Sequence, residues 1–90
     1  FYSLQANTAG SSNVAAGKSA LAANTEGDSN TALGFDSGNA ITTGDNNLCL
    51  GYQAGISGSP GGAITAGDDF IWLGDENITE AHIQVDWTIA

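Results

Sequence analysis

Very few side chains of this 90-residue chain could act as acids, bases, nucleophiles or metal ligands. His82 is the only histidine, so one chain cannot assemble a Ser-His-Asp triad or a multi-histidine metal site. Cys49 is the only cysteine and has no disulfide partner within the chain, so we expect it to act as a small buried apolar residue. Asp75, Glu76 and Glu80 form the nearest carboxylate cluster, a pattern typical of a solvated loop. The sequence therefore predicts no catalytic residue and no enzyme activity.

Gly17, Lys18 and Ser19 have the order found at the end of a phosphate-binding loop. That motif requires a glycine five positions before Gly17, where Ser12 stands instead. Ten acidic residues against one basic residue give a net charge of −9, and no basic patch can form for nucleic acid or an anionic membrane. No apolar run reaches the length needed to cross a membrane. We expect no cofactor, no nucleic acid and no membrane insertion.

Three residues are weak candidates for metal ligands. Asp68 and Asp69 follow a glycine in a turn, where carboxylate and backbone oxygens would suit calcium. Turn chemistry explains such aspartates without a metal, because their side chains bond to nearby backbone groups. His82 could meet two symmetry copies on the threefold axis of a trimer, whereas an ordinary exposed strand histidine is the simpler interpretation. We predict no resident metal ion.

The elements that position these residues come from a repeat of seventeen residues. A Thr-x-Gly turn begins each of four matching segments, and the first three follow one another at that spacing. The fourth arrives six residues late because of an insertion within 56–63 that holds Pro60 and the only Gly-Gly pair. The segments are residues 8–13, 25–30, 42–47 and 65–70. We divide the chain into a lead-in from an upstream shaft (1–7), four repeat units (8–74) and a C-terminal tip (75–90).

A short apolar segment closed by glycine follows each turn, and we expect these segments to be strands. In the second and third, alternation places the small residues Ala32 and Cys49 on one face and bulky residues on the other. The bulky residues are Thr31, Leu33, Phe35, Leu48, Leu50 and Tyr52. We expect the linkers to be irregular or briefly helical, with one helical turn conceivable over 18–23. The expected strands, each with its closing glycine, cover residues 14–17, 31–34, 48–51 and 71–74.

Large apolar residues are too few and too widely spaced to build a lone globular core. A repeat of this kind cannot bury its strand alone, so copies must stack or associate with identical chains. From about Ala81 the sequence alternates strictly, with Val85, Trp87 and Ile89 on one face, which predicts a half-buried C-terminal strand. The fold prediction is all-β, with short strands in a β-helix-like or β-roll-like repeat; that the assembly is a homotrimeric fibre is what the resemblance given next implies. Strands wound around a shared axis and a separate coil for each chain are both compatible with the pattern.

Two of the repeat units and the C-terminal stretch resemble a known family. Residues 30–35 and 47–55, spaced by Thr-Thr-Gly-Asp-Asn-type turns, look like the distal repeats of bacteriophage tail fibres and tail spikes. Residues 72–74 followed by 83–90 are similar to the segment that precedes the intramolecular chaperone of endosialidase-type fibres. That chaperone assists trimerisation and then cleaves itself off. The resemblance implies an extracellular virion protein, a homotrimer, a chaperone partner before cleavage, and Ala90 as the autocleavage boundary.

Attachment to the host cell surface is the function that the resemblance implies, with a surface glycan or protein as the receptor. Exposed aromatic side chains and projecting loops suit such contacts, which makes Trp72 and the insertion the candidates for receptor binding. The candidate residues of the insertion are Gly58, Ser59, Pro60, Gly61 and Gly62. The alternatives are the head of a bacterial trimeric adhesin and a non-catalytic part of a glycan-degrading tail spike.

Overall fold

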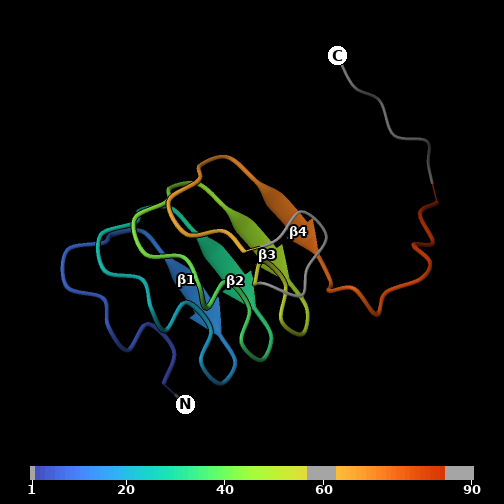
Figure 1. Ribbon diagram of the computed structural model, residues 1–90, viewed down its shortest axis with the longest axis horizontal. Coiled ribbons are helices and arrows are strands. Elements are labelled where there is room, and N and C mark those ends of the chain that lie inside the picture. The colour runs from blue at the N-terminus through green and yellow to red at the C-terminus, as the bar shows by residue number, and fades with distance from the viewer. Residues whose placement is uncertain (1, 57–62, 85–90) are drawn as a thin grey trace.

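The computed structural model describes residues 2–56 and 63–84, which form one parallel sheet and the loops that connect its strands (Figure 1). The strands are β1 (Val14–Ala16), β2 (Thr31–Leu33), β3 (Leu48–Leu50) and β4 (Ile71–Leu73). They pair in the order β1-β2-β3-β4, and every pair is parallel. The described residues contain no helix. The prediction of an all-β chain is confirmed, as are the four strand positions.

Each strand makes one coil together with the turn before it and the loop after it, and the coils stack with their strands on one side (Figure 1). The register follows the repeat, because Ala15 pairs with Ala32, Ala32 with Cys49, and Cys49 with Trp72. The six-residue insertion therefore leaves the strand register intact. We number the coils by their strands: coil 1 is residues 8–24, coil 2 is 25–41, coil 3 is 42–64, and the partial coil 4 is 65–74.

Each coil turns at a residue with positive φ shortly before its strand. The residues are Ser12, Ser29, Asn46 and Asp69, with φ values of 59°, 59°, 56° and 66°. Serine, asparagine and aspartate are suited to this position, because short polar side chains can bond to nearby backbone groups when φ is positive. The polar corner of the repeat is therefore a conformational requirement of the coil.

Residues 18–23 form turns, so the helical turn considered for this linker is wrong. Ser19 and Leu21 have φ values of 63° and 51°, which a right-handed helix excludes. The amide of Leu21 donates to the carbonyl of Ser37 in the next coil at 3.0 Å. The linker thus takes part in the hydrogen bonding between coils, and local helix formation would break these bonds.

Backbone amides at the start of coils 1, 2 and 3 converge on a carbonyl oxygen of the next coil. In coil 2, the amides of Thr25, Glu26 and Gly27 all donate to the carbonyl oxygen of Thr42, at 3.0, 3.2 and 3.3 Å. The Thr-x-Gly segments of coils 1 and 3 bond in the same way to the carbonyls of Thr25 and Thr65. Three successive amides around one oxygen form a small concave site for an acceptor. This contact repeats at every junction between coils.

Asparagines just before the strands form a second connection, which we call the asparagine ladder: Asn13, Asn30 and Asn47. Asn30 has no exposed surface, and its amide donates to Oδ1 of Asn13 at 2.8 Å. Its own Oδ1 accepts the amide of Asn47 at 2.9 Å, and its Nδ2 donates to the carbonyl of Gly44 at 2.7 Å. Phe70 occupies the position in coil 4, where its amide bonds to Asn47 Oδ1 and the ladder ends.

The core lies inside the coils and is built from small or medium side chains. The buried apolar residues are Ala20, Leu21, Ala32, Ile41, Cys49, Ala54 and Ile64. Leu4, Ala15 and Trp72 pack against them from partly buried positions. The interior of a coil is narrow, so residues such as Ala32 and Cys49 fit where a large side chain would not.

The C-terminal segment leaves the stack after β4 (Figure 1). Residues 81–84 are not in a strand, so the prediction of a strand from Ala81 is wrong for this part. Alternation alone does not form a strand, since the backbone also needs a neighbouring strand to receive its hydrogen bonds. The described residues supply none here. Residues 85–90, which include Trp87, lie outside the described part of the chain.

Candidate functional site

The outward side of the sheet is apolar, and we call it the apolar sheet face. Alternation within each strand turns the middle residue inward and the first and third residues outward. The face consists of Val14, Ala16, Thr31, Leu33, Leu48, Leu50, Ile71 and Leu73. Thr31 is its one polar member, and no charged side chain belongs to it. The face therefore differs from the rest of this acidic chain.

Several members of the apolar sheet face are strongly exposed. Ile71 is 70% exposed, Val14 54%, Leu73 53% and Leu33 42%. A strand of a globular protein usually turns its bulky side inward, whereas here the small side chains Ala32 and Cys49 are the buried ones. Sequence alternation predicted the two faces correctly. Continuous apolar surfaces of this kind mark places where another protein surface binds.

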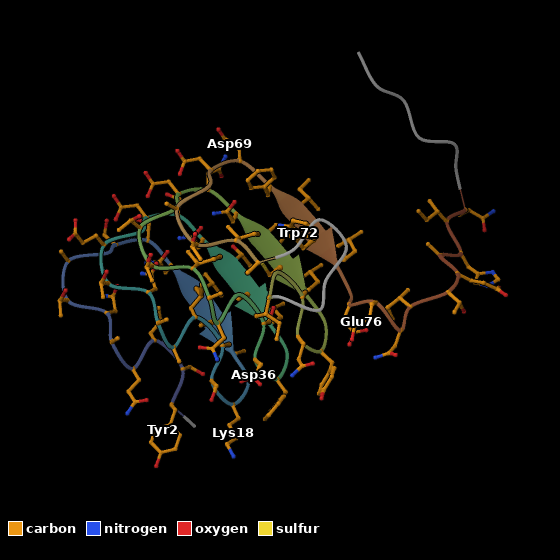
Figure 2. The ribbon with its side chains drawn as sticks, viewed as in Figure 1. Tyr2, Lys18, Asp36, Asp69, Trp72 and Glu76 are labelled. Atoms are coloured by element: carbon orange, nitrogen blue, oxygen red, sulfur yellow. The ribbon has the colours of Figure 1, made fainter. Side chains whose placement is uncertain are left out.

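Three side chains beside the strands stack along the coils. Phe35 and Tyr52 follow the glycines that close β2 and β3, and their rings are parallel, with centroids 5.6 Å apart and an interplanar angle of 13°. The ammonium of Lys18 lies 5.9 Å from the Phe35 centroid. The Lys18 ammonium therefore lies over an aromatic ring, whereas the lysine of a phosphate-binding loop contacts a phosphate. Figure 2 shows Lys18 and Asp36 together at one edge of the stack.

Trp72, a predicted receptor contact, lies in the strand at the inward position. It pairs in register with Cys49 and packs against the buried core while remaining partly exposed. Its ring is tilted by 46° against Phe70, with centroids 6.2 Å apart. Its Nε1 is shielded from solvent and has no hydrogen-bond partner among the described residues. Much of this side chain thus closes the end of the core.

The weak metal candidates Asp68 and Asp69 accept hydrogen bonds from coil 3. Asp68 Oδ1 accepts the amide of Asp45 at 2.7 Å, and Asp69 Oδ1 accepts Nδ2 of Asn46 at 2.8 Å. Asp45 in turn accepts the amide of Asp28 at 2.8 Å, so the acidic corners bond from coil to coil. Asp69 lies at the edge opposite Lys18 and Asp36 (Figure 2). These contacts give the aspartates a structural role.

The third metal candidate, His82, lies in the segment beyond the stack. Its Nε2 is 2.8 Å from a carboxylate oxygen of Glu80, and both side chains are largely exposed, at 87% and 72%. No group of three or more His, Cys, Asp or Glu side chains able to hold a metal occurs in 2–56 or 63–84. Asp75, which was expected on a solvated loop, is instead buried, and its carboxylate accepts the amide of Asn77 at 3.0 Å. Asp75 thus caps a local turn.

Cys49 is buried in the core, as the sequence predicted. Burial raises the pKa of its thiol from 9.0 to about 11, because the charged thiolate would lose its hydration. A thiol in this state is a poor nucleophile and a poor metal ligand at neutral pH. Its position facing Ala32 and Trp72 in the register is that of a space-filling residue.

Some predicted site residues lie outside the described part of the chain. They are the insertion residues Gly58, Ser59, Pro60, Gly61 and Gly62, and the boundary residue Ala90. Within the described residues there is no pocket. A helix long and apolar enough to cross a membrane is likewise absent from this part of the chain. The geometry therefore directs attention to the apolar sheet face rather than to a cavity.

Comparison with families of known proteins, with curated proteins and with solved structures found no match for the chain. The asparagine ladder is the feature that sequence reasoning missed. Asn13, Asn30 and Asn47 keep the same place in the repeat, and that spacing was the available signal. Asparagine is also common in turns, so its type alone did not distinguish a buried ladder from an exposed corner.

Proposed function

We propose that this chain is a distal segment of a homotrimeric phage tail fibre or tail spike, with a structural and host-attachment role and no catalysis of its own. The observation that carries the proposal is the apolar sheet face. The family and the attachment role rest on the resemblance of residues 30–35 and 47–55 to fibre repeats.

The apolar sheet face supports association with other copies of the chain. Its outward residues run through all four strands in register, so the face is continuous along the stack. Burial of apolar surface contributes roughly 25 cal/mol per Å², or about 1.5 to 3 kcal/mol for a leucine that passes from fully exposed to fully buried. Leu33, which is 42% exposed, can gain only part of this amount. The absence of charge on the face removes the repulsion that a net charge of −9 per chain would otherwise impose there. Identical chains in cyclic symmetry can cover such a face on every subunit.

Mass in solution tests the assembly. We expect light scattering to give about 27 kDa, three times the 9.0 kDa of one chain. The double substitution Leu33→Asp and Leu50→Asp should produce a monomer, because carboxylates would have to be buried in the interface. Thr43→Asp is the matched control, since residue 43 is exposed in a turn away from the face. A wild-type monomer with an ordered β signal would contradict the trimer.

The attachment role requires a separate measurement. We expect the trimer to bind purified lipopolysaccharide or capsule of a susceptible bacterium in a surface-binding assay, and the Leu33→Asp, Leu50→Asp monomer to bind at least about a hundredfold more weakly through loss of multivalency. Failure of the wild-type trimer to bind susceptible cells would contradict the role. Release of oligosaccharide during incubation would overturn the proposal that the chain is not an enzyme.

The C-terminal boundary belongs to the same proposal. If a self-cleaving chaperone follows this segment, Ala90 supplies the acyl side of the scissile bond, and the catalytic groups lie in the chaperone. Expression of the gene with its downstream sequence, followed by mass spectrometry, should give a mature product that ends at Ala90. A product that retains the downstream residues would exclude cleavage at this bond.

A further inference from the structure

The hydrogen bonding of the last coil, which contains β4, differs from that of coils 1 to 3. In coils 1 to 3 the amides of each Thr-x-Gly segment bond to a carbonyl of the following coil. The corresponding amides of coil 4, from Thr65, Ala66 and Gly67, have no acceptor among the described residues. At the opposite end, the carbonyl of Thr8 accepts no bond from the described residues. The described stack therefore has unbonded amide donors at its β4 end and an unbonded carbonyl acceptor at Thr8, which are the groups that pair at each junction between coils.

Phe70 covers the place that the next coil would occupy above Gly67. A Cβ added to Gly10, Gly27 or Gly44 would meet the carbonyl oxygen of the equivalent glycine in the following coil. A Cβ added to Gly67 would meet instead the Phe70 ring, with Cε2 at 2.5 Å. Phe70 stands where coils 1 to 3 have asparagine, so the residue that would continue the ladder is replaced by one that covers its end.

Ile78 likewise covers the place that the next coil would occupy above Gly74. The glycines that close β1 and β2 lie against backbone, because a Cβ on Gly17 would be 2.7 Å from the carbonyl carbon of Gly34, and one on Gly34 would be 2.8 Å from that of Gly51. A Cβ on Gly74 would meet only the side chain of Ile78, including its Cδ1 at 3.2 Å. The Ile78 side chain therefore occupies the position where the backbone of a fifth coil would lie.

We propose that Phe70 and Ile78 form an end cap that stops the coil stack, so that chains associate through the apolar sheet face and not end to end. The cap blocks two separate points at which a further coil must approach closely, the Thr-x-Gly turn and the glycine that closes the strand. Among the residues that the structure describes, no carbonyl completes a junction with the amides of 65–67. An edge strand such as β4, with unpaired backbone groups, otherwise promotes pairing with another chain.

Removal of the cap tests this inference. Phe70→Asn restores the residue of the other coils, and Ile78→Ala removes most of the cover above Gly74. We expect the weight-average mass of this double variant to grow at least about twofold over a tenfold rise in concentration, whereas the mass of the wild type stays constant. The matched control is Phe35→Asn with Ile83→Ala, which changes the composition identically at two exposed residues elsewhere and should not grow.

End-to-end growth must be separated from sideways association. In the Leu33→Asp, Leu50→Asp background, loss of the cap should still produce growth, because the ends remain intact. A folded uncapped variant whose mass equals that of the wild type at every concentration would overturn the inference, as would growth of the wild type itself. Hydrogen exchange on the wild type gives an independent readout: amides 65–67 should exchange at least about a hundredfold faster than amides 25–27. Equal protection of the two sets would show that amides 65–67 are hydrogen-bonded to a further coil. That result would also overturn the end-cap inference.

Discussion

Asn30 shows how much one buried polar side chain contributes to the junction between coils. It bonds to Asn13, Gly44 and Asn47 and has no contact with solvent. An asparagine amide offers both donors and an acceptor, so one residue satisfies backbone groups that a coil junction would otherwise leave buried and unpaired. No apolar residue of similar size could do this.

Asn30→Ala should therefore be strongly destabilising. The substitution leaves the amide of Asn47 and the carbonyl of Gly44 without their partners, at a cost of about 2 to 4 kcal/mol for the two groups together. Asn39→Ala is the control, because Nδ2 of the Asn39 side chain donates only a long 3.4 Å bond to Oδ1 of Asp36, and the loss of this bond should change stability by less than about 0.5 kcal/mol. Urea unfolding followed by circular dichroism measures both. Equal effects of the two substitutions would contradict the importance of the ladder.

Cys49 gives the stability of the chain a dependence on alkaline pH. The folded pKa of about 11 lies above the ordinary 9.0, so the folded chain holds the thiol proton more tightly than the unfolded chain. The stabilising effect is complete below about pH 9 and is lost as the pH rises toward about 11. Cys49→Ala, which copies Ala32 of the preceding coil, should remove this part of the decline. Unfolding midpoints at several pH values would check it, and an unchanged decline in the variant would assign the effect to other groups.

At the scale of the element, coils 1 and 2 fill the same two interior positions with different pairs of residues. Coil 1 has Leu21 and Asn24, whereas coil 2 has Gly38 and Ile41 at the same positions. A Cβ added to Gly38 would lie 3.1 Å from Leu21 Cδ2 and 3.3 Å from Ile41 Cδ1, so the isoleucine fills the space that a leucine would take. Asn24 Oδ1 is buried without a partner, because the next coil offers isoleucine where an asparagine amide could donate. The two positions are therefore coupled.

A double-mutant cycle tests this coupling. Gly38→Leu alone should destabilise by about 1 to 3 kcal/mol through overpacking against Leu21 and Ile41. Gly38→Leu combined with Ile41→Asn reproduces the arrangement of coil 1 and gives Asn24 Oδ1 a donor, so part of that loss should be recovered. We expect a favourable interaction energy of about 1 kcal/mol or more from denaturant unfolding of the four proteins. Additive effects would show that the two positions act independently.

Sequence predicted the positions of the four strands because the Thr-x-Gly corners and closing glycines impose local conformations that repeat with the residues. It also separated Ala32 and Cys49 from Leu33 and Leu50. Which set faces the core was not predictable from periodicity, since both sets are apolar and only the width of the coil decides. The strand expected from Ala81 failed because alternation reports what a strand could bury and not whether a pairing partner exists.

At the scale of the molecule, the described chain divides into a bonded stack and a segment that leaves it. The coils are joined by backbone bonds, by the asparagine ladder and by the bonded acidic corners. Within the described part of the chain, the hydrogen bonds of residues 76–84 are local, such as the bond from the Ile78 amide to Asp75 and the pair between His82 and Glu80. Stability is therefore unevenly distributed along the chain.

Hydrogen exchange should report this division. Amides of β2 and β3 are flanked by coils on both sides and should be the slowest, while amides 79–84 should exchange nearly as fast as an unfolded chain. Slow exchange at 79–84 in the assembled protein would instead show that this segment pairs with a neighbouring subunit. The Leu33→Asp, Leu50→Asp monomer then tells the two cases apart, because protection that comes from a neighbour disappears in it.

Because the junctions between coils are in register, a whole coil could be removed or inserted as one unit. Thr8, Thr25, Thr42 and Thr65 occupy the same place in their coils, and the bonds at each junction connect the same positions. Loss of residues 25–41 as a block would join Asn24 to Thr42 and recreate a junction of the kind already present. Insertions or deletions of whole coils would then change the length of the stack by one coil at a time. The hydrogen bonds at each junction would stay the same. Length in such a protein can vary through unequal copying of seventeen codons, with little need for new packing.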